Sequence, residues 1–358
     1  MNNFLKLLRG RDRTLDILEK VEWPSHMTHM ITLDASSSLF YLSSLTRQAD
    51  FKIDAFETRI QDYSVLKQAF ARNQAIQLDA YDAQKIAESS IIYDSGFMWL
   101  EASQQKNMHS LQTLCQKVKK DCPIFIAGAN EEGIKSWQDK FKKWNLEVSV
   151  VANARGARVL QLNNPQNIDG DHSVKNSFVS AQINSYTLDF LAPTGVFCEA
   201  QLDTGTRILL EHLPSLENKK VWDFGCGTGS VSLFAQHQKA SEIWATDSDY
   251  WAVLATISNC QKISPTVEAH WSFLNESIEL PLFDIIITNP PFHVVKSLHL
   301  EIGDIWLKSC YKQLQTNGQI WLVCNQFLKY REFAQNNKLN AELIIQKSGF
   351  HVWKMTKI

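Results

Sequence analysis

The sequence lacks the features of membrane, disulfide-rich and strongly charged proteins. No apolar run in the 358 residues approaches the roughly 20 residues of a membrane-spanning helix, and no signal peptide is present. The seven cysteines form no C-x-x-C pair, and no histidine follows them at zinc-ligand spacing, which argues against disulfides or structural zinc. The 36 basic and 38 acidic residues exclude a protein-wide basic field, although a local basic patch stays possible. These absences predict a cytoplasmic protein with no membrane or metal partner.

The composition and length indicate a globular protein of two domains. Hydrophobic residues make up 44% of the chain and charged residues 21%, which excludes a disordered polymer. A chain of this length usually divides, and the segment 163–177 is rich in Asn and Asp and poor in apolar residues. We therefore predict a linker there, with domains at residues 1–170 and 177–358.

The second half alternates short apolar segments with amphipathic ones. This alternation predicts an α/β fold whose parallel sheet is covered on both faces, with the β-branched segment 283–288 at its centre. A short turn joins the last two apolar segments, which predicts a closing antiparallel hairpin. The expected strands are 220–224, 242–246, 267–273, 283–288, 319–324, 341–346 and 350–356, and the expected helices are 231–236, 250–259 and 301–315.

The first half repeats this pattern. Residues 92–97 and 124–130 each match a segment 195 positions further along, and Gly156 matches Gly349 within the two expected hairpins. Three matches in the same order indicate a duplicated domain. Two unrelated α/β domains with a similar rhythm are the alternative.

A glycine-rich loop, DFGCGTG at 223–229, directly follows an expected strand and precedes a helix. Glycines let the backbone approach a ligand, and the helix start offers free N–H groups. Asp223 is placed to bind a cationic or amino group. Asp247 lies at the end of the next strand, where its carboxylate can accept hydrogen bonds from the two hydroxyls of a ribose. A helix N-cap is the alternative for Asp247, although Asp249 is the better cap candidate.

The second motif is NPPF at 289–292, directly after the expected buried strand. Its prolines withhold N–H groups, so their carbonyls and the Asn289 amide are left as oriented acceptors. Such acceptors suit a planar amine on a conjugated ring, on which Phe292 could stack. A plain turn with an N-cap Asn is the alternative.

The order DFGCGTG, ATD, NPPF resembles the class I S-adenosylmethionine-dependent methyltransferases that act on exocyclic or amide nitrogen. The extension to NPPFH, with Gly195-Val-Phe197 and Leu202-Asp203-Thr-Gly205 upstream, resembles the ribosomal RNA small subunit methyltransferase C family. This resemblance, firmest over 194–358, implies two tandem Rossmann-like methyltransferase domains. Each would have a seven-stranded, mostly parallel sheet ending in an antiparallel hairpin, and the N-terminal copy would be degenerate.

The resemblance implies methyl transfer from S-adenosylmethionine to the exocyclic N2 of a guanine in 16S rRNA, within the small ribosomal subunit. A large-subunit (23S) guanine-N2 enzyme, a protein-glutamine or DNA-adenine methyltransferase, and a non-catalytic RNA-binding assembly factor stay open. Ser272 stands where the family often has Asn or Asp. The implied residues are Asn289, Pro290 and Phe292 for catalysis, Asp223, Gly225, Gly227, Gly229, Asp247 and Ser272 for the cofactor, and Phe197 and His293 for the base.

The first half lacks these parts. Its segment 31–38 has no glycine where the cofactor loop is expected, and we match its 94–97 to the NPPF motif. We expect this domain to bind no cofactor and to hold RNA or support the other half. The basic residues that could contact RNA, or simply form a solvated face, are Arg9, Arg11, Arg13, Lys117, Lys119 and Lys120.

Two other chemical signals are weak. His26 and His29 have no evident third ligand for a metal, so core or surface roles explain them better. Cys226 lies inside the glycine loop, where a small residue is needed for fit, so we interpret it as a structural residue and not as a nucleophile.

Overall fold

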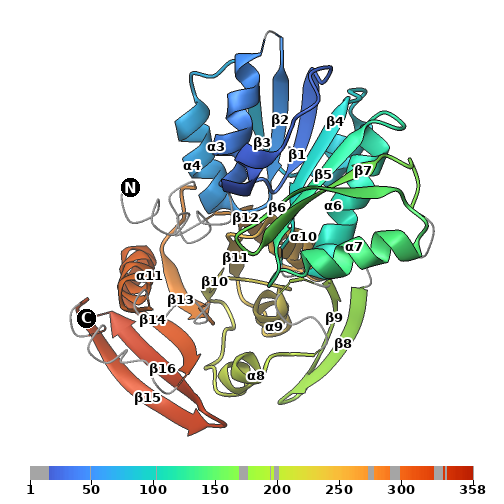
Figure 1. Cartoon of the computed structure of the whole chain (residues 1–358). Helices are drawn as coiled ribbons and strands as arrows, with labels where there is room; N and C mark the ends of the chain where they lie inside the picture. The colour runs from blue at the N-terminus through green and yellow to red at the C-terminus, as the bar shows by residue number, and fades with distance from the viewer. Residues whose placement is uncertain are drawn as a thin grey trace. The chain divides into compact units, whose positions relative to one another are not determined.

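The chain forms two compact units in this computed structural model, Met1–Lys175 and Asn176–Ile358 (Figure 1). The structure describes residues 16–357 except 49, 102, 169–175, 194, 197–200, 273–277, 291–298, 326–333 and 335–336. Within this described part, no helix is both long and apolar enough to cross a membrane.

The second unit contains one large sheet with helices between its strands. The strands are β10 (Lys220–Phe224), β11 (Glu242–Asp247), β12 (Val267–Trp271), β13 (Phe283–Thr288), β14 (Leu314–Asn325), β15 (Leu339–Lys347) and β16 (Phe350–Lys357). The helices are α8 (Thr204–Glu211), α9 (Ser230–His237), α10 (Tyr250–Cys260) and α11 (His299–Gln313).

The strand order in this sheet is β12-β11-β10-β13-β14-β16-β15. The first five strands are parallel, whereas β16 runs antiparallel to both β14 and β15. The predicted α/β class and the closing antiparallel hairpin are therefore confirmed.

Each face of this sheet packs into its own apolar core, because side chains alternate along a strand. On β10, Val221 points into one core, and Trp222 and Phe224 point into the other. Phe224 stacks on Trp306 of α11 with ring centroids 3.8 Å apart. The strand that precedes the glycine loop is thus fixed from both sides.

Two strands precede this sheet in the second unit, β8 (Asn176–Ile183) and β9 (Tyr186–Pro193), and they form a separate antiparallel pair. Leu188, Phe190 and Ala192 of β9 are buried and alternate with exposed residues. We did not predict this hairpin or α8, although the period-two pattern of β9 is visible in the sequence.

The first unit repeats the same topology. Its strand order is β3-β2-β1-β4-β5-β7-β6, with β7 antiparallel to both neighbours, so the predicted duplication is confirmed. Gly156 and Gly349 occupy the corresponding hairpin turns. Its elements are η1 (Asp16–Lys20), β1 (His29–Leu33), α3 (Ser38–Leu42), η2 (Ser43–Arg47), β2 (Lys52–Glu57), α4 (Ile60–Phe70), β3 (Ile76–Ala80), α5 (Ala83–Glu88), β4 (Ser95–Trp99), α6 (Gln104–Lys117), β5 (Pro123–Ala129), α7 (Ile134–Lys143), β6 (Val148–Ala154) and β7 (Ala157–Asn163).

The strand register corrects one of our sequence matches. Leu33, the last residue of β1, pairs with Met98, and Phe224, the last of β10, pairs with Thr288. Trp99 is therefore the counterpart of Asn289, and the match of 94–97 to the NPPF motif is wrong. Similar apolar residues recur along neighbouring strands. A short sequence match can therefore be out of register by several residues and still align apolar residues with apolar residues.

Candidate active site

Three strand ends of the second unit lie side by side and assemble the predicted site. Phe224 pairs with Thr246 on one side and with Thr288 on the other. The residues that follow these three, Gly225, Asp247 and Asn289, therefore lie at one edge of the sheet. The carboxyl ends of parallel strands are where ligands bind in such sheets.

The loop after β10 has a backbone that requires glycine. Gly225, Gly227 and Gly229 have φ values of +84°, +54° and +80°, in the left-handed region that favours glycine. A Cβ on Gly229 would lie 2.9 Å from the Cα of Thr256, so α10 leaves no room for a side chain there. The loop also receives support from β11, because the N–H of Gly225 donates to the Thr246 carbonyl at 2.8 Å.

Asp247 connects this loop to the start of α10. One carboxylate oxygen accepts from the N–H of Gly227 at 3.0 Å, and the other accepts from the N–H of Asp249 at 2.9 Å. Asp249 is the N-cap of α10 and accepts from Trp251, so our preference for Asp249 as the cap is confirmed. Burial is the main cause that raises the pKa of Asp247 to about 6.

Asp223 has a contact that we did not predict. Its Oδ2 accepts from both the N–H and the hydroxyl of Ser232, at 3.0 and 2.6 Å, which ties the end of β10 to the first turn of α9. The side chain is 1% exposed, and burial raises its pKa to about 7. A buried carboxylate with this pKa is destabilised as an anion and would be stabilised by a cationic ligand.

Two buried hydroxyls beside these acids have no hydrogen-bond partner among the described residues. Ser272 follows β12 directly, and its N–H donates to the carbonyl of Asp247 at 2.9 Å, while its Oγ is unpaired. The Oγ1 of Thr228 in the glycine loop is also unpaired. Buried polar atoms are normally satisfied, so unpaired hydroxyls here fit a site that receives a polar ligand.

Asn289 is held by residues from α8. Its Nδ2 donates to Oδ2 of Asp203 at 3.1 Å and to Oγ1 of Thr206 at 2.9 Å. Pro290 is buried. We did not assign a role to Asp203 or Thr206, although an Asp followed by Thr-Gly-Thr at a helix start is a recognisable N-cap signal. The other predicted residues of this region, Phe197, Phe292 and His293, lie outside the described residues.

The weaker candidates have structural roles. Cys226 is 4% exposed, and burial raises the pKa of its thiol well above the usual range, which disfavours a nucleophile. The imidazole of His29 lies 3.1 Å from Asp54. No group of three metal-binding side chains occurs in the described part of the chain.

Comparisons with known proteins identify the class of the second unit. Residues 187–354 match the family described as "Methyltransferase small domain". The second unit is a methyltransferase domain. It carries the glycine loop, Asp247 and Asn289 within the matched range.

Relatives that match a longer part of the chain are named "Ribosomal RNA small subunit methyltransferase C". The Hahella chejuensis protein is 28% identical over 233 residues, which cover 64% of this chain and 68% of the relative. The Psychromonas ingrahamii protein is 24% identical over 294 residues, which cover 81% and 82%. The resemblance to this family is confirmed.

A solved structure extends the likeness to both units. The T. thermophilus 16S rRNA N2 methyltransferase (RsmC), solved in complex with AdoMet and guanosine, has a TM-score of 0.83 and 22% identity. The match covers 97% of this chain and 92% of that chain. It establishes that the tandem methyltransferase fold is shared over the whole length.

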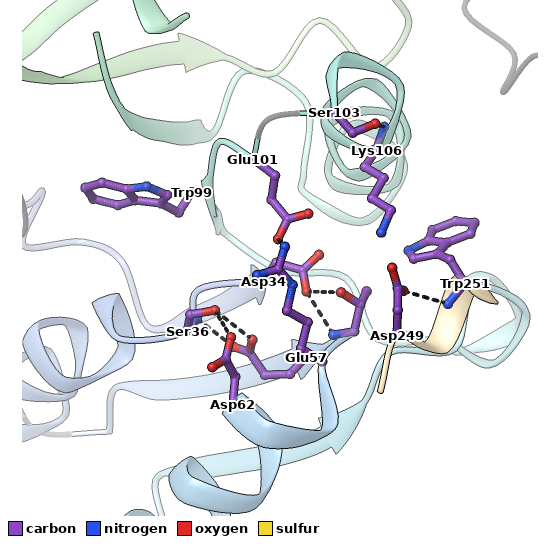
Figure 2. Close-up of polar contacts among 12 residues, drawn as sticks. Asp34, Ser36, Glu57, Asp62, Trp99, Glu101, Ser103, Lys106, Asp249 and Trp251 are labelled. Atoms are coloured by element: carbon purple, nitrogen blue, oxygen red, sulfur yellow. Dashed lines mark hydrogen bonds and ion pairs between the residues drawn. The ribbon is translucent and has the colours of Figure 1, made fainter. Parts of the chain in front are cut away.

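The first unit shares hydrogen bonds with the methyltransferase domain but has side chains where that domain has glycines. The N–H of Ser36 donates to Glu57 at 2.9 Å, as Gly227 does to Asp247. Asp34 occupies the position of Gly225 and accepts from the N–H and hydroxyl of Thr58 at 2.8 and 2.7 Å (Figure 2).

The same region of the first unit contains further acids. The hydroxyl of Ser36 donates to Asp62 at 2.7 Å (Figure 2). Glu101 pairs with Arg59 at 3.1 Å. Burial raises the pKa of Asp34 to about 7 and that of Glu57 well above its usual range. The side chains of Asp34 and Ser36 therefore stand in the first unit where the methyltransferase domain has Gly225 and Gly227.

Proposed function

We propose that this protein transfers a methyl group from S-adenosylmethionine to the exocyclic N2 of a guanine in 16S rRNA, within the small ribosomal subunit. The observation that carries the proposal is the oriented amide of Asn289, one strand from the glycine loop. The relatives named for small-subunit rRNA methylation support the substrate. The guanosine and AdoMet in the similar T. thermophilus structure support the base and the cofactor.

The residues at the strand ends fit S-adenosylmethionine. Glycines at 225, 227 and 229 allow its close approach. The carboxylate of Asp247 would accept from the ribose hydroxyls, and the buried anion of Asp223 favours the cationic amino-acid part. Ser272 has an unpaired hydroxyl and would contact the adenine. When bound, S-adenosylmethionine supplies a methyl group on an electrophilic sulfonium.

The residues around Asn289 would hold the target amine. Its Oδ1 and the carbonyl of Pro290 accept the two N–H groups of the guanine N2, which directs the nitrogen at the methyl carbon. Phe292 would stack on the base, and Phe197 and His293 would line its pocket. The nitrogen held in this way would receive the methyl group, S-adenosylhomocysteine would leave, and the proton lost by nitrogen would pass to water. Positioning supplies much of the barrier reduction, so no metal or covalent nucleophile is needed.

The first unit would act in support. We propose that it binds no cofactor and contacts the RNA or stabilises the catalytic half, with the reaction taking place in the cytoplasm. A guanine inside an RNA helix must be flipped out to reach the pocket, so a second RNA-contacting unit would help to hold the opened helix.

Methyl transfer from labelled S-adenosylmethionine tests this function. The protein is incubated with small subunits, large subunits and the protein-free rRNAs, and the labelled base is identified by nucleoside digestion. We expect N2-methylguanine in 16S rRNA, with small-subunit particles as the best substrate. Label only in 23S rRNA would indicate the large-subunit enzyme, and no label in any RNA would indicate a non-catalytic assembly factor.

A further inference from the structure

The amide of Asn289 forms hydrogen bonds with Asp203 and Thr206 at the start of α8, and these two residues also bond to each other. Asp203 accepts at Oδ2 from the N–H of Thr206 at 2.9 Å and from the Thr206 hydroxyl at 3.3 Å. Because that hydroxyl proton is used on Asp203, the Thr206 oxygen is free to accept from Asn289. Nδ2 of Asn289 donates to this oxygen at 2.9 Å and to Asp203 at 3.1 Å.

This set of hydrogen bonds determines which way the amide of Asn289 faces. An amide oxygen and an amide nitrogen are similar in shape, so an isolated Asn can adopt either orientation. A carboxylate accepts hydrogen bonds and cannot donate them, so only the NH2 group of Asn289 can face Asp203. The reversed amide would bring two partly negative oxygens to about 3 Å, which is strongly unfavourable in a partly buried site.

We propose that Asp203 and Thr206 are positioning residues that hold Oδ1 of Asn289 toward the target amine. This inference rests on the proposed function, in which Oδ1 is an acceptor for the guanine N2. Nδ2 donates to Asp203 and Thr206, and Oδ1 lies on the other side of the planar amide. A reversed amide would present donors to an amine that also donates, and would repel it.

The fold keeps Asp203 in place for this task. Asp203 is the N-cap of α8, so its carboxylate already faces the start of that helix. Two residues further on, Gly205 has little room for a side chain. A Cβ there would lie 3.0 Å from the Phe350 ring and 3.1 Å from Asp203 Oδ2. The D-T-G-T sequence thus supplies an N-cap, the space for its carboxylate and a second acceptor.

Asp203→Ser separates positioning from folding. Ser is as good an N-cap as Asp, so α8 should persist. Its hydroxyl is shorter than the carboxylate and can donate as well as accept, so it no longer enforces one orientation of Asn289. We expect kcat for methyl transfer to small subunits to fall about 10- to 100-fold, with KM and the Kd for S-adenosylmethionine within about twofold.

Thr206 provides the second variant and its rescue. Thr206→Val keeps the shape and removes the acceptor, so kcat should fall as in Asp203→Ser. Thr206→Ser keeps the hydroxyl and should restore at least half of the kcat. Asp82→Ser is the matched control, because Asp82 caps α5 in the first unit by accepting from the N–H of Lys85 at 3.0 Å. Its kcat should equal that of the wild type.

A measurement without substrate distinguishes this inference from the proposed function. In 15N spectra of the full chain, the Nδ2 group of Asn289 should be protected from exchange. Protection should fall in Asp203→Ser and Thr206→Val, and remain in Thr206→Ser and Asp82→Ser. Unchanged protection, or unchanged kcat in both disruptive variants, would overturn the positioning role. Absence of methyl transfer by the wild type would overturn the proposed function and leave the exchange result to decide the inference.

Discussion

The N–H of Gly227 donates a 3.0 Å hydrogen bond to a carboxylate oxygen of Asp247. The acid therefore has a structural task besides its proposed contact with the ribose. It holds the middle of the glycine loop against the end of β11, while its other oxygen accepts from Asp249. The loop shape and the proposed ribose contact would therefore depend on one side chain.

Asp247→Asn should weaken S-adenosylmethionine binding about 10- to 100-fold, in line with about 1.5–3 kcal/mol for a hydrogen bond to a charged group. An Asn can accept from only one of the two backbone N–H groups that Asp247 satisfies, so its NH2 group would face the other. Isothermal titration calorimetry measures the change. Glu57→Gln is the matched control, because Glu57 holds Ser36 in the same way in the first unit. An equal loss in the control would contradict the prediction.

Cofactor affinity should fall as the pH decreases. Burial raises the pKa of Asp223 to about 7 and that of Asp247 to about 6, and the cationic ligand favours both anions. Protons therefore compete with the ligand, and the Kd should rise about tenfold or more between pH 8 and pH 5.5. Calorimetry across this range tests the prediction, and a Kd independent of pH would refute it.

The same raised pKa values predict the opposite trend for the stability of the ligand-free protein. The folded state holds these two protons more tightly than the unfolded state does. The free energy of unfolding therefore loses their contribution as the pH rises from about 4 to 7. Ligand added at pH 8 should recover stability, which denaturant titrations with and without S-adenosylmethionine can follow.

Local sequence patterns predicted the strands, the loop and their order, because a buried strand followed by glycines or by Asn-Pro leaves a distinct local signature. Contacts between distant segments left no such signature. The bond between Asn289 and Asp203 joins residues 86 positions apart. It follows from the way α8 packs beside β14 and β16, which no local pattern encodes.

The register of the first unit shows a second limit. Our sequence match made Asp94 the counterpart of Asn289, whereas the strand pairing makes Trp99 its counterpart. Asp94 lies at the other end of β4, where it accepts from the N–H and hydroxyl of Thr28. Apolar strands tolerate such shifts in a sequence comparison, and only the hydrogen-bonded neighbours determine the true correspondence.

Gly229→Ala should lower the free energy of unfolding by about 1–3 kcal/mol more than Gly133→Ala does. This is the usual range for forcing extra atoms into a packed site. Both glycines are N-caps with nearly equal backbone angles, φ +80° and ψ 16° against φ +86° and ψ 17°. Gly133 has nothing within 4 Å of an added Cβ, whereas Gly229 would meet Thr256 at 2.9 Å. Chemical denaturation measures the free energy of unfolding of both variants. Equal losses would show that the close packing of α10 against Gly229 is unimportant.

Asn289→Ala should leave cofactor binding unchanged and reduce single-turnover methyl transfer about 100-fold or more. The amide lies at the end of β13 and provides the acceptor that we assign to the target amine, whereas Gly227 and Asp247 lie on the neighbouring loop and strand. Calorimetry and a labelled-methyl assay provide the two readouts. Full activity in this variant would exclude the amine-binding role of Asn289.

The chain should bind one S-adenosylmethionine, although it contains two copies of the fold. In the first unit, Asp34 and Ser36 stand where the methyltransferase domain has Gly225 and Gly227, and their side chains bond to Thr58 and Asp62. A ligand there would have to break these buried bonds, at about 1–3 kcal/mol for each group left unpaired. Calorimetry of the wild type should give a stoichiometry near one, and Asp247→Asn should weaken that single site. A stoichiometry near two, or a tight site that survives in the variant, would show that the first unit also binds the cofactor.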